Sequence, residues 1–320
     1  MTWHPNSGVD IARARASMIH RARQYFDDHD VLEVLTPALS QTAVTDPNID
    51  SIAALLNDKT LYLHTSPEYM MKRLIAAGFP DIYQVCRVFR DAESGRRHQP
   101  EFTMIEWYRL GFDLDSIIED AICLITALVD SRSLERPKIV TYSDVYKETL
   151  SIDPLSASIA TLIDIADADE SLRQSVRDDR DAWLDLVFAT QISPGFDENR
   201  LTVVFHYPGS QASLARICPQ DAAVADRFEV YLGAVELANG FVELTDADQQ
   251  LARFEEDRDV RSADGKRDVA IDYKLIEALR AGMPECAGVA LGLDRLLMIA
   301  EGLSDIADVM TFTPGGHRAG

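Results

Sequence analysis

Two stretches of the chain alternate apolar and polar residues with a period of two, on either side of a polar loop. The stretches cover Ile82–Arg90 and Phe102–Leu110, and the loop between them contains Gly95. Alternation of this kind places successive side chains on opposite faces of a sheet, and a glycine-containing loop between two such runs favours a hairpin. The pattern therefore predicts an antiparallel β-hairpin at 82–110.

Helical spacing dominates much of the remaining chain. Apolar residues recur every three or four positions from Ile11 to Phe26, which predicts a long first helix. A strand closed by proline is predicted at Val31–Pro37, and a loop at Asp46–Asn57. The further predicted helices are Tyr69–Ala77, Leu114–Val129, Leu251–Arg261 and Lys274–Ala281. The other predicted segments are strands at Leu61–Leu63 and Leu201–Tyr207, a connector at Ser131–Pro137, and short helices with Asp-rich loops over 138–199.

Composition narrows the class of protein. The chain has 320 residues, of which 47% are apolar, so it can bury a sizeable core as one large domain or as a domain with an insertion. No run of about 18 apolar residues occurs, which predicts no membrane span, and the first ten residues lack the pattern of a secretory signal. The four cysteines are scattered without a metal-ligand spacing, as expected of a reduced, cytoplasmic protein without structural zinc.

The formal net charge of −22 is the unusual feature of the composition. A surface this acidic repels polyphosphate backbones, so we expect no stable binding of tRNA. A saline habitat produces acidity of the same kind, so the charge alone does not identify a partner. It weighs against a tRNA-handling protein without excluding one.

The loop of the predicted hairpin carries side chains suited to a nucleotide. Arg90, Arg96 and Arg97 offer guanidinium groups that pair with phosphate oxygens. The ring of Phe102 offers a stacking face to a base, and His98 lies between Arg97 and Phe102 in the sequence. The alternative is an ordinary amphipathic hairpin with a solvated basic loop, and this segment alone does not separate the two.

Three motifs resemble those of the class II aminoacyl-tRNA synthetases. Phe89-Arg90 followed by His98–Phe102 resembles motif 2, and the continuation Thr103–Tyr108 resembles the lysyl branch of that family. The helix, strand and proline within 8–40 are similar to motif 1, and the glycine turn and helix within 287–300 are similar to motif 3. The resemblance covers nearly the whole chain, and it is strongest to stand-alone lysyl paralogues that attach β-lysine to elongation factor P.

The resemblance implies an α+β fold, with an antiparallel β-sheet flanked by helices as in class II catalytic cores. It implies a single catalytic domain over 1–320, with motif 2 within 81–110, an insertion-like region at about 131–199 and no anticodon-binding domain. It further implies a homodimer formed through motif 1, ATP and Mg²⁺ as cofactors, and β-lysine and elongation factor P as substrates.

The resemblance also assigns roles to individual residues. Arg90 and Arg295 would be catalytic, because they would hold the phosphates. ATP would be bound by Arg90, Asp91, Ala92, His98, Gln99, Phe102, Glu236, Leu237, Gly292 and Arg295. The lysine-type substrate would be bound by Ser66, Pro67, Glu68, Glu106, Tyr108, Asn239, Phe241, Glu243 and Ala290. Glu229 and Glu236 would hold Mg²⁺, which favours carboxylate oxygens.

The chain departs from the family pattern at two positions. Ala92 stands where class II enzymes usually carry glutamate, so Asp91 or Glu93 is expected to take over its contact. Ala290 stands where synthetases usually carry glycine. An extra methyl group in an amino-acid pocket discriminates by roughly 1–3 kcal/mol, which puts ordinary α-lysine in doubt as the substrate.

The two expected metal ligands raise a geometric question. Glu229 and Glu236 are seven positions apart, and on one continuous strand an odd spacing places them on opposite faces. A bulge near Gly233 would bring the two carboxylates together.

Three functions from different classes remain. The first is a ligase that activates (R)-β-lysine as an acyl-adenylate and transfers it to a lysine of elongation factor P. The second is a lysine-activating enzyme with tRNA or a small amine as acceptor, and the third is a non-catalytic, synthetase-like regulatory subunit. Ala92 is the one residue in favour of the third function. The motif residues that favour an enzyme are Arg90, Phe102, Glu236 and Arg295.

Overall fold

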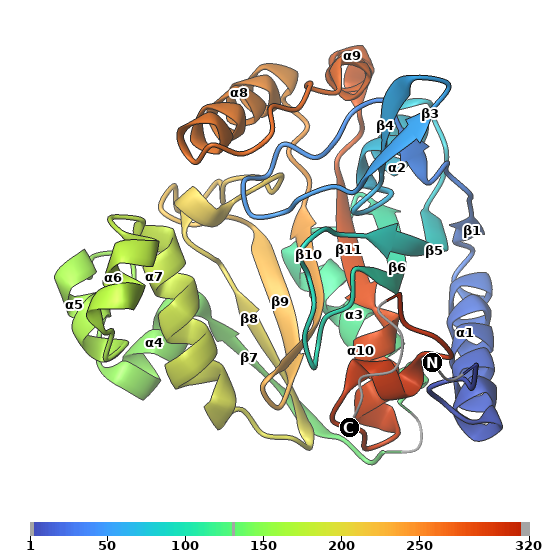
Figure 1. Cartoon of the computed structure of the whole chain (residues 1–320), viewed down its shortest axis with the longest axis horizontal. Helices are drawn as coiled ribbons and strands as arrows, with labels where there is room; N and C mark the ends of the chain where they lie inside the picture. The colour runs from blue at the N-terminus through green and yellow to red at the C-terminus, as the bar shows by residue number, and fades with distance from the viewer. Residues whose placement is uncertain (1–2, 130–131, 315–320) are drawn as a thin grey trace. The chain divides into compact units, whose positions relative to one another are not determined.

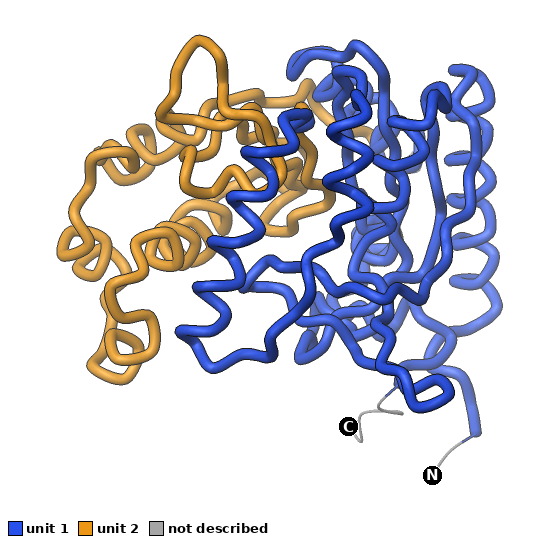
Figure 2. Tube along the Cα trace, turned by 90° about the horizontal axis from the view of Figure 1, so that it is seen from above, with its two compact units in different colours: residues 1–132, 243–320 blue, residues 133–242 orange. Residues whose placement is uncertain are grey.

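The computed structural model describes residues 3–129 and 132–314, and the chain divides into two compact units. Residues 1–132 and 243–320 make up unit 1, and residues 133–242 make up unit 2 (Figure 2). No helix in the described residues is long and apolar enough to cross a membrane. The single catalytic domain with an insertion-like region stays a prediction.

The strands of unit 1 follow one another in the order β1-β5-β6-β11 (Figure 1). Their bounds are β1 Leu32–Glu33, β5 Ile82–Phe89, β6 Glu101–Leu110 and β11 Cys286–Gly292. β5 and β6 pair antiparallel as the predicted hairpin, β11 pairs antiparallel with β6, and β1 pairs parallel with β5. The helices of unit 1 are α1 Val9–Asp28, α2 Glu68–Ala76, α3 Leu114–Leu128, α8 Ala247–Ala263, α9 Tyr273–Gly282 and α10 Leu293–Ala300.

The two faces of β6 have different neighbours, because side chains alternate along a strand. On one face, Trp107 donates a hydrogen bond to Asp120 of α3 at 2.9 Å. On the same face, Thr103 accepts one from Arg15 of α1 at 3.3 Å, and Arg15 also pairs with Asp294 of α10. Helices therefore cover this face. The opposite face carries Phe102, Met104, Glu106 and Tyr108.

A small second sheet in unit 1 has the order β2-β4-β3. Its strands are β2 Leu39–Ser40, β3 Ala53–Leu56 and β4 Lys59–Leu63. The loop predicted at Asp46–Asn57 is therefore wrong at its end. Asn57 and Asp58 have φ of 49° and 61°, and two residues with positive φ form the kind of tight turn that joins antiparallel strands.

The strand predicted at Val31–Pro37 is shorter in the structure, where β1 contains only Leu32–Glu33. The cause lies just after it. The Thr36 N–H donates to the side chain of Gln84 at 2.9 Å instead of joining a backbone ladder. A side-chain acceptor has replaced the strand partner there.

The strands of unit 2 have the order β10-β9-β8-β7. They are β7 Glu135–Thr141, β8 Arg200–Phe205, β9 Arg227–Leu232 and β10 Val235–Val242. The connector predicted at Ser131–Pro137 is wrong from Glu135 onward, because Glu135 pairs with Arg200 of β8. The helices are α4 Tyr142–Leu150, α5 Ile159–Ile165, α6 Glu170–Val176 and α7 Arg180–Val187. They pack with β8 and β9 around a buried cluster that includes Tyr142, Tyr146, Trp183, Phe188 and Tyr231. The predicted α+β fold is confirmed.

Candidate active site

A buried acid lies on the face of β6 opposite the one that helices α1, α3 and α10 cover. Glu106 is only 2% exposed, and Tyr108 on the same face donates a hydrogen bond to its Oε1 at 2.8 Å. Ser66, which precedes α2, donates to Oε2 at 2.6 Å. Burial, together with the nearby carboxylate of Glu68, raises the pKa of Glu106 to about 8. An acid in this state exchanges its proton for a bound cation near neutral pH.

A second buried acid, Glu243, follows β10 in the chain and belongs to unit 1. Its backbone N–H donates to the carbonyl of Cys286 in β11 at 2.9 Å, and its side chain is fully enclosed. Burial raises the pKa of Glu243 to about 8. Its Oε1 is buried and has no hydrogen-bond partner among the described residues. Such an oxygen is costly unless a ligand supplies a donor, so it marks a position for one.

A resident cation lies between the acids. Lys72 of α2 is 1% exposed, and its Nζ lies 2.5 Å from Glu243 Oε2 and 2.6 Å from Glu68 Oε1. Burial alone lowers the pKa of a lysine, but Glu243 and Glu68 outweigh it and raise the pKa of Lys72. Lys72 was not predicted from the sequence. Its position four residues after Glu68 on a helix was an available signal.

Strand β11 supplies small residues beside these acids. Gly288 pairs with Tyr108, and Ala290 pairs with Glu106. A Cβ atom on Gly288 would lie 2.6 Å from Glu243 Oε1 and 2.6 Å from Tyr108 Cε1, so only glycine fits without a shift. Because cross-strand partners share a face, the methyl group of Ala290 lies on the side of Glu106.

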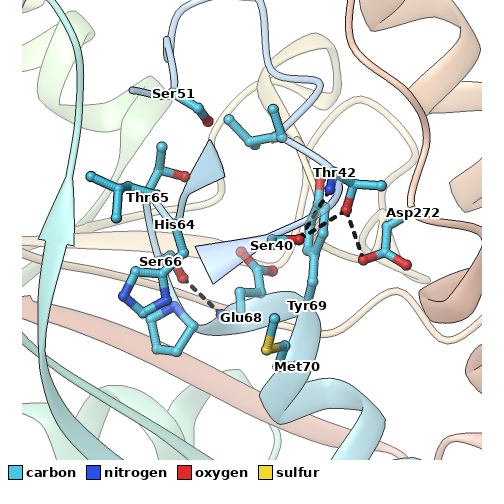
Figure 3. A pocket seen from close by; sticks show the side chains of 14 residues that line it. Ser40, Thr42, Ser51, His64, Thr65, Ser66, Glu68, Tyr69, Met70 and Asp272 are labelled. Carbon is cyan, nitrogen blue, oxygen red and sulfur yellow. Dashed lines mark hydrogen bonds between the residues drawn. The ribbon is translucent and has the colours of Figure 1, made fainter. Parts of the chain in front are cut away.

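A pocket with about 490 Å³ of empty space opens beside Ser66 and Glu68 (Figure 3). Pro67 is the N-cap of α2, and the Ser66 hydroxyl accepts the Glu68 N–H at 3.0 Å. Across the pocket, Thr42 donates to Asp272 at 3.1 Å.

Arg90 follows β5 and closes the hairpin loop, since its N–H donates to the carbonyl of Pro100 at 2.9 Å. Its guanidinium carbon lies 5.2 Å from the centre of the Phe102 ring. Within the described part of the chain, Arg90 Nε is buried and has no hydrogen-bond partner. A buried donor without a partner points to an anionic oxygen as its ligand.

Arg295 of α10 meets the same loop. Its Nη2 lies 2.7 Å from His98 Nε2, and its Nε donates to the carbonyl of Arg97 at 3.2 Å. Gly292 is the last residue of β11 and the N-cap of α10, and Gln99 next to His98 is buried. The structure thus brings His98 and Arg295, which the sequence assigns to phosphates, into contact.

A third group of predicted residues lies in unit 2, around Glu229 of β9. Tyr207 at 2.7 Å and Tyr231 donate to its Oε2, and Arg227 at 2.6 Å and Asn239 at 3.2 Å donate to its Oε1. Burial raises the pKa of Glu229, while the Arg227 guanidinium opposes that rise. Neither tyrosine nor Arg227 was predicted from the sequence, although Arg227, Glu229 and Tyr231 are alternate positions of β9 and so share a face.

Glu229 and Glu236 lie on a hairpin and not on one continuous strand. Gly233, with φ of 55°, lies in the turn between β9 and β10. Glu236 pairs with Tyr231, and the register shifts at Leu237. Tyr231 is two residues from Glu229 on β9, so the hairpin pairing places Glu236 on the face of Glu229, and the extra residue at Leu237 brings Asn239 opposite Glu229. The bulge predicted near Gly233 is therefore wrong in position, since it occurs at Leu237.

Residues 5–314 match the model of a family described as tRNA synthetases class II (D, K and N). The chain belongs to the class II tRNA synthetases. Relatives in Pasteurella multocida and Mannheimia succiniciproducens are 43% and 45% identical over 316 residues, and one in Photorhabdus laumondii is 45% identical over 318 residues. Each alignment covers 97% of both chains, and all three proteins are called elongation factor P–(R)-beta-lysine ligase.

The class II identity confirms the predicted family, the fold and an amino-acid ligase that uses ATP. It leaves the role of each site residue as a prediction. The departure from the class II pattern at position 92, where alanine replaces the usual glutamate, is accompanied by a change in which acid contacts Arg90. Glu93 lies 3.5 Å from Arg90, whereas Asp91 accepts the N–H of Ala92 at 2.8 Å. Ala92 has φ of 60°, so the loop turns there and presents Glu93 to the arginine.

The two expected Mg²⁺ ligands of this class II chain differ in how readily their carboxylates could coordinate the ion. Glu236 is partly exposed, and carboxylate oxygens suit Mg²⁺. Each oxygen of Glu229 already accepts two hydrogen bonds, which fills the lone pairs of a carboxylate. Direct coordination by Glu229 would require a donor to withdraw, whereas contact through water would leave the donors in place.

Two further residues of β10 have distinct surroundings. Asn239 Oδ1 is buried without a hydrogen-bond partner among the residues that the structure describes, so it can accept a bond from a ligand. Phe241 packs against a small alanine cluster formed by Ala212, Ala215 and Ala225.

A separate group in unit 2 contains ligand types that metals use. The ligand atoms of His206, Cys218 and Asp226 lie within 4.8 Å of one another. Asp226 Oδ2, however, accepts two hydrogen bonds from Arg216, at 3.0 and 2.7 Å. A guanidinium in this position opposes a second cation.

Proposed function

We propose that the protein is an ATP-dependent ligase that joins a β-lysine-type amino acid to a lysine ε-amine of elongation factor P. The observation that carries this proposal is the cluster of largely buried acids, Glu68, Glu106 and Glu243, in unit 1. A lysine-type substrate brings two ammonium groups, which require such acids. The acceptor is inferred from the names of relatives that align over 97% of both chains.

The first chemical step is attack by the amino-acid carboxylate on the α-phosphorus of ATP. A bond forms between the carboxylate oxygen and phosphorus, the bond to the β-phosphate oxygen breaks, and pyrophosphate leaves. Such a step needs positioning and charge neutralisation more than covalent help from the protein. The buried Nε of Arg90 would bind an oxygen of the α-phosphate, and Phe102 would stack on adenine. His98 and Arg295 would bind the departing phosphates.

The second step transfers the acyl group. The neutral ε-amine of the acceptor lysine attacks the acyl carbonyl, an amide bond forms, the bond to AMP breaks and the amine loses a proton to solvent. Glu106 and Glu243 hold the substrate ammonium groups throughout. In this proposal Mg²⁺ bound by Glu236, with Glu229 as its second carboxylate, would offset the negative charge of the phosphates.

A homodimer through the motif 1 region is part of the proposal. Large apolar side chains are exposed along this part of unit 1, and an exposed apolar group of this kind marks an interaction surface. Within 8–40 they include Leu32, Leu35 and Leu39, with Leu35 at 82% exposed, and Leu55 and Leu56 of β3 are exposed in the small sheet that contains Leu39. We further propose a cytoplasmic enzyme that does not bind tRNA stably, which the net charge of −22 supports.

The deciding experiment supplies elongation factor P and total tRNA together, with ATP and labelled β-lysine or α-lysine. We expect the mass of elongation factor P to rise by one lysyl unit, with β-lysine preferred and tRNA unlabelled. Arg90→Ala is the inactive control. Label on tRNA alone would favour a tRNA ligase, and no pyrophosphate exchange with either isomer would favour a regulatory protein.

A further inference from the structure

The ion pairs of Lys72 connect two elements of unit 1 that meet at the acidic pocket. Lys72 and Glu68 are one turn apart on α2, and Glu243 follows β10. The ammonium lies 2.6 Å from one oxygen of Glu68 and 2.5 Å from one oxygen of Glu243. Lys72 is therefore held by charge from both sides and is closed off from solvent.

Glu106, the third acid, is held by neutral groups. Its two oxygens accept from the hydroxyls of Ser66 and Tyr108, so its own charge is not compensated by these bonds. Lys72 uses Oε2 of Glu243 and leaves Oε1 without a hydrogen-bond partner in the described structure. When all three acids are ionised, three carboxylates and one ammonium leave two negative charges.

We propose that Lys72 is a positioning residue: it holds Glu68 and Glu243 toward the substrate and sets the pocket charge to match an amino acid with two ammonium groups. This inference rests on the proposed function. A methionine at this place would fill similar space without charge. Burying an ammonium is costly unless it is paired, so the paired lysine marks a charge requirement and not a packing requirement.

The pH dependence of the pocket follows from all the groups that face Lys72. They are Glu68 on α2, Glu106 on β6, Glu243 after β10 and Cys286 on β11, while Tyr108 on β6 faces the three acids. Glu106 and Glu243 must be ionised to receive a cationic substrate, so its affinity rises with pH. Without Lys72, these acids lose the cation that favours their ionised form. The rise of substrate affinity with pH is then displaced to higher pH.

The test measures pyrophosphate exchange of the full chain with β-lysine and ATP across pH 6 to 9, for Lys72→Met and wild type. We expect Lys72→Met to raise KM for the amino acid at pH 7 by about tenfold or more, with KM for ATP within about twofold. The rising limb of the pH profile should move up by about one unit. Lys72→Arg, which keeps the charge, should hold that limb near its wild-type position. Lys274→Met, an exposed lysine of α9, is the matched control.

Wild-type activity separates the two levels of the proposal. A wild type that shows no exchange with any lysine isomer overturns the proposed function. Active wild type with an unchanged amino-acid KM and an unchanged limb in Lys72→Met overturns only the role of Lys72. Should Lys72→Met fail to fold, Lys72→Gln, which can hydrogen-bond both acids without a charge, must show the same displacement, and an unmoved limb in that variant again overturns the role.

Discussion

Arg295 Nη2 lies 2.7 Å from His98 Nε2, which joins helix α10 to the loop between β5 and β6. The two residues come from motifs separated by 197 positions in the chain. Neither motif alone distinguishes a phosphate site from a solvated basic loop. Their contact places a guanidinium and an imidazole together, which supports the proposal that both bind a phosphate group.

Arg295→Ala should lower pyrophosphate exchange by about 10²- to 10³-fold, because removing one donor to developing charge typically has this effect. The amino-acid affinity should change little, since the acids of unit 1 are intact. Steady-state exchange assays with varied ATP and varied amino acid would measure both effects. Arg13→Ala provides the control, because Arg13 is exposed on α1 and pairs only with Asp10 in the ion pairs of the described structure. Equal activity of the two variants would contradict a phosphate role for Arg295.

Glu106 should make binding of the cationic substrate depend on pH. Its pKa is raised from 4.5 to about 8, so between these values the folded protein keeps a proton that the unfolded chain has released. The contribution of Glu106 to the free energy of unfolding therefore falls as pH rises between these two values. A bound ammonium favours the ionised form, so binding at pH 7 should release a proton.

Glu106→Gln should reduce the number of protons released on binding by about one, and flatten the rise of affinity with pH. Calorimetric titration with β-lysine in buffers of different ionisation enthalpy would give the number directly. Glu277→Gln, an exposed acid on α9, should leave it unchanged. The same proton count in Glu106→Gln as in wild type would show that another group titrates.

The hairpin and the helix at α10 could be predicted from the sequence because their patterns are local. The alternation of apolar and polar residues predicted both ends of β5 and of β6 to within one residue. The glycine turn before Arg295 predicted the change from β11 to α10. The end of the loop before Asn57 could not be predicted in this way, because β3 is four residues long and its identity depends on pairing with β4.

The arrangement of the candidate site residues depended on pairing that the sequence does not show. The spacing of Glu229 and Glu236 left their faces open until the pairing of Glu236 with Tyr231 in the hairpin was known. Lys72 was overlooked because a lysine on an amphipathic helix is most often exposed. The resemblance to lysyl enzymes supplied Glu106 and Glu243, but burial and the ion pairs give them their physical meaning.

Ala290→Gly should weaken discrimination between β-lysine and α-lysine. The methyl group lies on the side of Glu106, where it narrows the space next to the acid. Removing one methyl group from a substrate pocket changes selectivity by roughly 1–3 kcal/mol, or about tenfold and more. The ratio of kcat/KM for the two isomers would measure it. Ala287→Gly is the matched control, because Ala287 is buried on the same strand and faces the other side. An unchanged ratio would remove Ala290 from the account of selectivity.

Gly288→Ala should damage the amino-acid pocket more than the fold. The new Cβ would lie 2.6 Å from both Glu243 Oε1 and Tyr108 Cε1, so one of these side chains must move. Overpacking of this kind costs about 1–3 kcal/mol of stability, whereas displacement of Glu243 removes the oxygen that awaits a substrate donor. We expect KM for the amino acid to rise by about tenfold or more, with KM for ATP nearly unchanged.

Gly195→Ala, which has open space around its Cβ position, is the control for the extra methyl group. Thermal unfolding measured with and without β-lysine separates the two effects, since a variant that only lost stability would keep the full stabilisation by ligand. If β-lysine stabilises the variant as much as it stabilises wild type, the pocket accommodates the methyl group. The position of Glu243 would then be less constrained than its contacts indicate.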